Sequence, residues 1–157
     1  MTDPDPIRTE AIAANGECWR LLEKLGRKPA ETEDMIVAAL ESLRLWQQVG
    51  TPVNDQRGHW MVARVYVEAG RAEPALGYAR ATLALTERHR DALKDFDRAF
   101  AEEVAARAFA LSGDATTAAA HYDKARQLGE AIANAGDRKE FFRQFALGPW
   151  FGLEERG

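Results

Sequence analysis

The sequence predicts an all-α fold, a stack of antiparallel helical hairpins. Alanine occupies 29 of 157 positions, whereas Val, Ile and Thr together occupy 19, and this balance favours helix over sheet. No stretch alternates with period two as a half-buried strand does. Glycines also follow five segments whose apolar residues recur at helical spacing, as expected just beyond helix C-termini. These glycines are Gly26, Gly50, Gly70, Gly113 and Gly136.

The first four helices are expected to form two hairpins. Residues 7–25 and 31–49 make the first, because the apolar positions of ECWRLLEKLG and EDMIVAALESLRLW recur three and four apart. Residues 54–69 and 72–88 make the second, with Gly70 in the connection. Connections this short make successive helices antiparallel.

The last three helices are predicted from the same signals, apolar residues at helical spacing followed by a glycine or a proline. Residues 95–112 and 115–134 make a third hairpin, whose first helix opens with acidic side chains that the helix dipole favours. The charged joint before it, 86–94, is expected to be a solvated extension of its helices. The closing helix, 137–147, ends before Pro149, which cannot continue it.

Two windows of the chain, 57–85 and 100–128, repeat one pattern when they are aligned on Gly70 and Gly113. Matching positions hold residues of the same kind: Ala63 with Ala106, Tyr66 with Phe109, Ala75 with Ala118, and Leu85 with Leu128. The second window also carries Tyr122 and Ala125, where the first has Ala79 (beside Tyr78) and Thr82. The two hairpins are therefore expected to share one geometry.

This pattern resembles the tetratricopeptide repeat, in which small residues let two helices approach and an aromatic residue fills the gap. The spacing of 113 − 70 = 43 residues exceeds the usual ~34, and neither window has the closing proline. Residues 48–76 are also similar to small bacterial tetratricopeptide-like proteins, a likeness that supplies a fold and no chemistry.

The resemblance implies one right-handed, tetratricopeptide-like α-solenoid domain over residues 1–157. Its parts would be a degenerate capping hairpin at 7–50, repeats at 54–88 and 95–134, and a capping helix with an aromatic tail at 137–157. The first hairpin either continues the stack or packs crosswise as a lid. Such an array needs covered ends.

Composition excludes several classes of protein. The formal net charge is −4 and the arginines are spread among acids, so no basic stripe predicts nucleic-acid binding. Cys18 is the only cysteine, which excludes an intrachain disulfide, and we expect it to be buried. No motif predicts a metal or a cofactor, and no apolar run is long enough for a membrane span. We expect a cytoplasmic protein.

The candidate binding site is an inner groove. Arg57, Trp60 and Arg64 fall within roughly 60° on one helix face. By the resemblance, Trp60 faces the groove, Glu103 takes the equivalent position in the next repeat, and Arg107 lies one turn on. Tryptophan and arginine are enriched at binding hot spots, and arginine pairs with carboxylates. The pattern therefore predicts a non-enzymatic scaffold that binds a protein or peptide, and the arginines would suit an acidic one.

The aromatic C-terminus offers an alternative. Five of the 14 aromatic residues lie within eleven positions: Phe141, Phe142, Phe145, Trp150 and Phe151. They either dock over the last hairpin or form an exposed patch through which the chain makes a homodimer.

The third hypothesis is a small cofactor-free hydrolase or isomerase. Asp55 and His59 lie four apart on one helix, so the carboxylate could orient the imidazole as a base. No recognisable nucleophile accompanies them. We therefore expect an ordinary contact on the helix surface.

Overall fold

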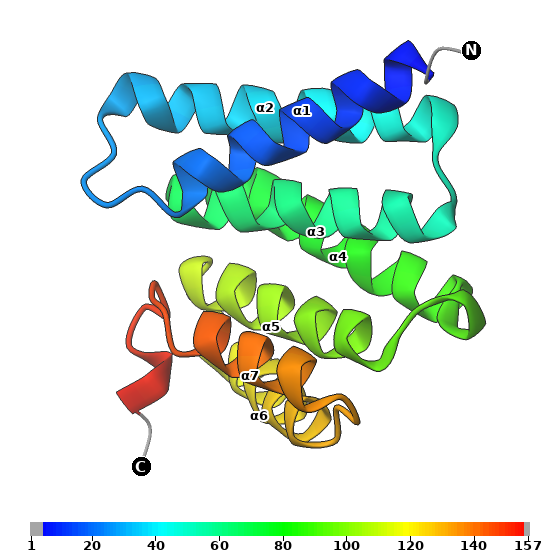
Figure 1. Ribbon diagram of the computed structural model, residues 1–157. Helices are drawn as coiled ribbons and strands as arrows, with labels where there is room; N and C mark the ends of the chain where they lie inside the picture. The colour runs from blue at the N-terminus through cyan, green and yellow to red at the C-terminus, as the bar shows by residue number, and fades with distance from the viewer. Residues whose placement is uncertain (1–4, 156–157) are drawn as a thin grey trace.

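The computed structural model describes residues 5–155, so the two ends of the expected domain, 1–4 and 156–157, lie outside the described residues. Seven α-helices make up most of the described chain (Figure 1): α1 (Pro6–Leu22), α2 (Pro29–Val49), α3 (Pro52–Glu68), α4 (Ala72–Arg88), α5 (Asp95–Leu111), α6 (Ala115–Glu130) and α7 (Ala135–Phe145). Two short 3₁₀ helices, η1 (Arg90–Ala92) and η2 (Leu153–Glu155), follow α4 and α7. No strand occurs among residues 5–155, so the all-α prediction is confirmed.

The helices pair into hairpins that lie in layers, with α1 and α2 at the top of Figure 1, α3 and α4 in the middle, and α5 and α6 below. Helix α2 packs on α3 in the way that α4 packs on α5, so the first hairpin joins the stack through its second helix. Helix α5 also contacts α3, and α7 packs against both α5 and α6. Helix α5 is therefore in contact with four helices: its own partner α6, both helices of the middle hairpin, and α7.

The helix ends show where the sequence signals were incomplete. Helices α1, α2 and α3 each begin at a proline, one or two residues before the expected start, because proline suits the first helical position. Helix α6 ends at Glu130 rather than 134. The expectation that Gly136 follows a helix is wrong: it lies in the first turn of α7, where the Asn134 side chain accepts from the backbone N–H of Asp137.

The two repeat hairpins turn in the same way. Gly70 and Gly113 adopt left-handed φ angles of 72° and 87°, which only glycine tolerates easily. The residue after each glycine donates its backbone N–H to the carbonyl of the aromatic residue that the two windows share, Tyr66 or Phe109. The N···O distance is 3.0 Å in both hairpins. In the first hairpin, by contrast, Gly26 stands four residues beyond the last residue of α1.

Ring contacts inside the two hairpins also correspond. Tyr66 stacks on Tyr78 with centroids 5.9 Å apart, and Phe109 stacks on His121 at 5.5 Å. Tyr78 and His121 both stand eight residues after the turn glycine. The aligned position of Tyr122, one residue later, does not make this contact, because Tyr122 packs against the C-terminal aromatics instead. The two hairpins therefore make the same ring contact, but the second helix contributes the eighth residue after the turn glycine, whereas the alignment predicts the ninth.

Two clusters of buried apolar side chains form the interior, and Phe100 of α5 packs against both. The first cluster joins α1 to α4, and the second joins α5 to α7 and the C-terminal segment. Cys18 is buried in the first, as expected, and burial, with the nearby charge of Glu17, raises the pKa of its thiol to about 12.

Candidate functional site

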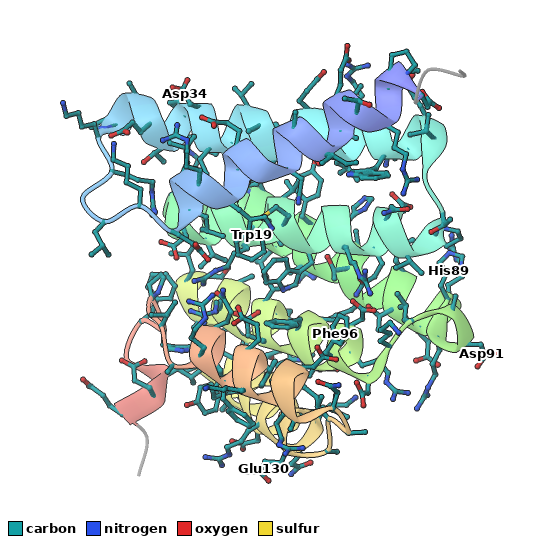
Figure 2. The ribbon with its side chains drawn as sticks, viewed as in Figure 1. Trp19, Asp34, His89, Asp91, Phe96 and Glu130 are labelled. Carbon is teal, nitrogen blue, oxygen red and sulfur yellow. The ribbon has the colours of Figure 1, made fainter. Side chains whose placement is uncertain are left out.

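A cavity of about 390 Å³ opens where α1, α2, α3, α5 and α7 meet. Its walls hold five aromatic side chains, namely Trp19, Trp46, Trp60, Phe96 and Phe100. Figure 2 shows Trp19 on α1 and Phe96 on α5, which reach the cavity from the upper and lower layers of the molecule. Volumes of 300–1,000 Å³ with mainly aromatic and apolar walls are typical of ligand sites.

Trp60 is the centre of the aromatic wall. It stacks on Trp19 with centroids 5.9 Å apart and meets Phe100 edge-on at 5.5 Å. Its indole Nε1 donates to the backbone carbonyl of Phe100 at 3.1 Å and to Glu103 Oε1 at 3.2 Å. Both acceptors lie on α5, so the two hydrogen bonds hold Trp60 in place across the boundary between α3 and α5, with its ring lining the cavity.

The charged side chains at the cavity are paired within the protein. Arg57 Nε and Nη2 donate to the two carboxylate oxygens of Asp97 at 2.8 and 3.0 Å. The Arg57 guanidinium also lies over the Phe96 ring, 5.2 Å from its centroid. On α7, Glu140 accepts from Arg143 at 2.7 and 2.8 Å. The lining therefore offers an anionic partner no unpaired arginine.

One buried polar atom of the lining has no partner. Gln56 is 1% exposed, and its Oε1 is buried without a hydrogen bond among the described residues. An unsatisfied buried acceptor costs about 1–3 kcal/mol. Because this oxygen has no accessible surface, a molecule in the cavity does not contact it in this arrangement, and the structure gives no account of its missing partner.

Two of the expected groove residues, Glu103 and Arg107, lie under the C-terminal segment. Arg107 is 0% exposed and pairs with the Glu103 carboxylate one turn earlier on α5. Its other N–H groups donate to the backbone carbonyls of Gln144, Leu147 and Pro149 at 2.8–3.0 Å.

The side chain of Trp150 covers the same guanidinium. The Arg107 Cζ atom lies 3.9 Å from the Trp150 ring centroid. Burial lowers the pKa of Arg107 to about 10, although the charge and hydrogen bond of Glu103 oppose that shift. The expectation that Arg107 and Glu103 face an open groove is therefore corrected: the end of the chain occupies that part of the inner face.

Arg64 is also buried rather than presented to a groove. It is 3% exposed, pairs with Glu68 at 2.9 Å and donates to the Gly148 carbonyl at 3.3 Å. Glu68 in turn pairs with Arg27 from the connection between α1 and α2 at 3.0 Å. Of the five expected groove residues, the structure places Arg57 and Trp60 at the cavity, holds Arg64 and Arg107 against the C-terminal segment, and buries Glu103 between Trp60 and Arg107.

Most of the aromatic tail is buried within its own chain. Phe141, Phe145 and Trp150 pack into the second core cluster, and Phe142 is packed against it. Trp150 donates its indole N–H to the Phe145 carbonyl at 2.8 Å. Phe151 alone among the five is largely exposed, at 45%. Docking over the last hairpin is the arrangement found, so four of the five offer little surface for self-association.

The other titratable candidates make local contacts. His59 Nδ1 lies 2.8 Å from the backbone carbonyl of Asp55 and 3.3 Å from its carboxylate, and the imidazole packs on Tyr78. His121 bonds to the Glu102 carboxylate. Burial raises the pKa of Glu102, but His121 and Lys124 more than offset it, so the pKa is lowered overall.

Metal-binding clusters and membrane-spanning helices do not occur among residues 5–155. No group of three or more His, Cys, Asp and Glu side chains is arranged to hold a metal ion. None of the helices there combines the length and apolar character that crossing a membrane requires.

Most of the cavity lining escaped the sequence analysis, including the aromatic residues Trp19, Trp46, Phe96 and Phe100, and also Gln56. Nothing in the sequence distinguishes Gln56 from a surface glutamine, because only its contacts on α4 and α5 bury it.

No family model matches this chain, and neither the curated proteins nor the solved structures contain a significant match to it. The tetratricopeptide identity therefore stays a prediction, and the function has to be argued from the cavity itself.

Proposed function

We propose that this protein is a non-enzymatic, tetratricopeptide-like scaffold that binds a peptide segment of a partner protein in the cavity lined by Trp19, Trp60 and Phe100. The observation that carries the proposal is the aromatic-walled cavity of about 390 Å³, whose own charged groups are already paired. Tryptophan side chains are favoured anchors of protein recognition because they bury much area at little entropic cost, and Trp19 and Trp46 are only partly buried at the cavity. We expect the protein to act in the cytoplasm, with no nucleic acid and no cofactor.

The pairing of charges changes the expected partner. Arg57 is bound to Asp97, and Arg64 and Arg107 are buried, so an acidic peptide would gain little from them. An apolar or aromatic anchor residue is better matched to the walls. A homodimer through the C-terminal aromatics has less support, since three of those side chains lie in the core.

A peptide-display selection on the intact protein tests the proposal, followed by titration of the selected peptides. Asn15, a half-buried residue at the cavity, is replaced by Trp to fill the site from the α1 side. Gln127→Trp is the matched control, because Gln127 is exposed on α6 and does not line the cavity. We expect Asn15→Trp to weaken binding at least about tenfold, which corresponds to one hot-spot contact, and Gln127→Trp to leave it unchanged.

Two results would overturn the proposal. Either the selection yields no peptide, or the selected peptides bind the Asn15→Trp variant as tightly as they bind the wild type. Circular dichroism of both variants establishes that the helices are retained.

A further inference from the structure

We infer that Arg8 selects partner peptides that carry an acidic side chain beside the apolar anchor, because it pairs with that carboxylate at the Trp46 end of the cavity. This inference rests on the proposed function and adds the charged group that the peptide presents there. Unlike the arginines of the expected groove, Arg8 has no acidic partner among residues 5–155.

Arg8 is an exposed cation next to the aromatic wall. Its guanidinium lies over the ring of Trp46, 5.2 Å from the centroid, and Trp46 lines the cavity. An arginine that stacks on an aromatic face keeps the N–H groups at its edge available, and their planar fork matches the two oxygens of a carboxylate. Within residues 5–155, four other arginines lack an ion pair, and none of them stacks on a ring of the cavity wall: Arg80, Arg88, Arg98 and Arg138.

Helix geometry places Arg8 on the side of α1 that faces the cavity. Asn15 and Trp19, which both line the cavity, stand seven and eleven residues after it. At 100° per residue these three positions fall within roughly 40° on one helix face. Arg8 therefore extends the row of lining residues on α1 by two turns, beyond the edge of the cavity itself.

The stability of α1 does not account for a cation at this position. Arg8 is the third residue of the helix, and the first turn of α1 contains no acidic residue. The helix dipole favours anions near a helix N-terminus and disfavours cations there. A bound carboxylate would offset this unfavourable charge as well as that of the guanidinium.

The charges elsewhere at the cavity point to one acidic group in the ligand. Arg57 is neutralised by Asp97, and the aromatic walls suit an apolar side chain, so Arg8 supplies one unmatched positive charge at the rim. A carboxylate carries one negative charge, whereas a phosphate group carries about −1.5 to −2 at pH 7. The lone arginine therefore matches Asp or Glu better than a phosphorylated residue.

The first test is a peptide-display selection on the wild type, Arg8→Glu and Arg80→Glu. Arg80 is the matched control because it is also exposed, stacks on Phe109 at 5.5 Å and has no ion pair within residues 5–155, but Phe109 does not line the cavity. We expect the wild-type and Arg80→Glu pools to combine an apolar residue with Asp or Glu at a constant spacing. The Arg8→Glu pool should keep the apolar residue and replace the acid with Lys or Arg.

The second test titrates one selected peptide and its counterpart in which the acidic residue is replaced by the corresponding amide. Both peptides have amidated C-termini, so a side chain supplies the carboxylate. We expect the replacement to weaken binding to the wild type and to Arg80→Gln about two- to fivefold, the range of a partly exposed ion pair. It should leave binding to Arg8→Gln unchanged. Circular dichroism establishes that the variants keep their helices.

The outcomes separate this inference from the proposed function. Three results overturn the role of Arg8 while the cavity remains a peptide site: selected peptides without a recurring acid, an acid that persists in the Arg8→Glu pool, or an equal loss on amide replacement in the wild type and Arg8→Gln. An acid that disappears from the Arg80→Glu pool also overturns it, because the overall charge of the protein would then explain the preference. If no selection yields a peptide, the proposed function fails together with the inference.

Discussion

Arg107 connects the inner face of the stack to the end of the chain. It lies on α5 with no exposed surface, and its guanidinium is shared between Glu103, three backbone carbonyls and the face of Trp150. Burying a charge is costly unless it is paired and fully hydrogen-bonded, and these partners meet that condition. The side chain therefore fixes where the segment after α7 lies.

Replacing Arg107 with Met should destabilise the protein strongly. The change leaves Glu103 as a buried carboxylate without its cation and leaves three carbonyls without a donor, so we expect a loss of about 3–5 kcal/mol in the free energy of unfolding. Urea denaturation measures it. In the double variant Glu103→Gln/Arg107→Met, part of this loss should be recovered, because the uncompensated charge is gone while an oxygen still accepts from Trp60.

Arg44→Met is the matched control for that prediction. Arg44 pairs with Glu41 on the exposed face of α2, where solvent screening leaves an ion pair contributing little to stability. A cost for Arg107→Met as small as that of Arg44→Met would show that Arg107 does not anchor the C-terminal segment.

The sequence identified these residues but not their surroundings. Arg57 and Trp60, which share one helix face, both line the cavity, because helix geometry is local. The expectation failed for Glu103 and Arg107 because their burial depends on α7 and the segment after it, which fold back over α5. The sequence alone does not distinguish a polar side chain on a helix that other elements cover from one on an exposed helix.

At the scale of the elements, Gly129 of α6 lies directly against Phe141 of α7. A Cβ atom there would lie 2.4 and 2.6 Å from two ring atoms of Phe141. Phe141 cannot move aside easily, since it is fully buried and contacts Phe100, Phe142 and Phe145. The absence of a side chain at Gly129 therefore sets the distance between the two helices.

We predict that alanine has opposite effects at two helical glycines. Gly129→Ala should destabilise the protein by about 1–2 kcal/mol, because overpacking against Phe141 exceeds the gain in helix propensity. Gly77→Ala on α4 should stabilise it by about 0.5–1 kcal/mol, since a Cβ there meets nothing within 4 Å. Thermal unfolding of the two variants measures the difference. Stabilisation by both would mean that α6 and α7 are not in this close contact.

The helices themselves were largely predictable, since their periodicity and turn glycines are local signals. All seven occur at the expected places, and the errors lie at their ends. Pro6, Pro29 and Pro52 each start a helix one or two residues before the start that apolar periodicity predicts, because proline at the first helical position is itself a start signal. Gly136 was misassigned because the true cap of α7, Asn134, stands two residues earlier.

At the scale of the whole molecule, the stack has different ends. The hairpin α1–α2 covers one side of α3, whereas α7 and the C-terminal segment close the other end against α5 and α6. The tail contributes Trp150 and Leu153 to the core cluster there, with Trp150 edge-on to Tyr122 at 4.9 Å and to Phe145 at 5.1 Å. The aromatic C-terminus thus works as an internal cap, the role that a repeat array assigns to its last element.

A chain that ends at Ala146 should therefore be less stable and should self-associate. It loses the carbonyls of Leu147 and Pro149 that hold Arg107, and the buried Trp150, a cost of at least ~3–5 kcal/mol for the aromatic side chain alone. The truncation also uncovers Phe145 and part of α6, and newly exposed apolar surface of this kind promotes association.

Urea unfolding and light scattering at matched concentrations test this prediction, with a chain that ends at Leu153 as the control, because it keeps every buried residue of the tail. The control should match the wild type in stability and mass. If the chain that ends at Ala146 is as stable and as small as the control, the tail is not a cap. A wild-type dimer that becomes a monomer on the same truncation would reverse the argument, since the aromatic tail would then join two copies instead of closing one.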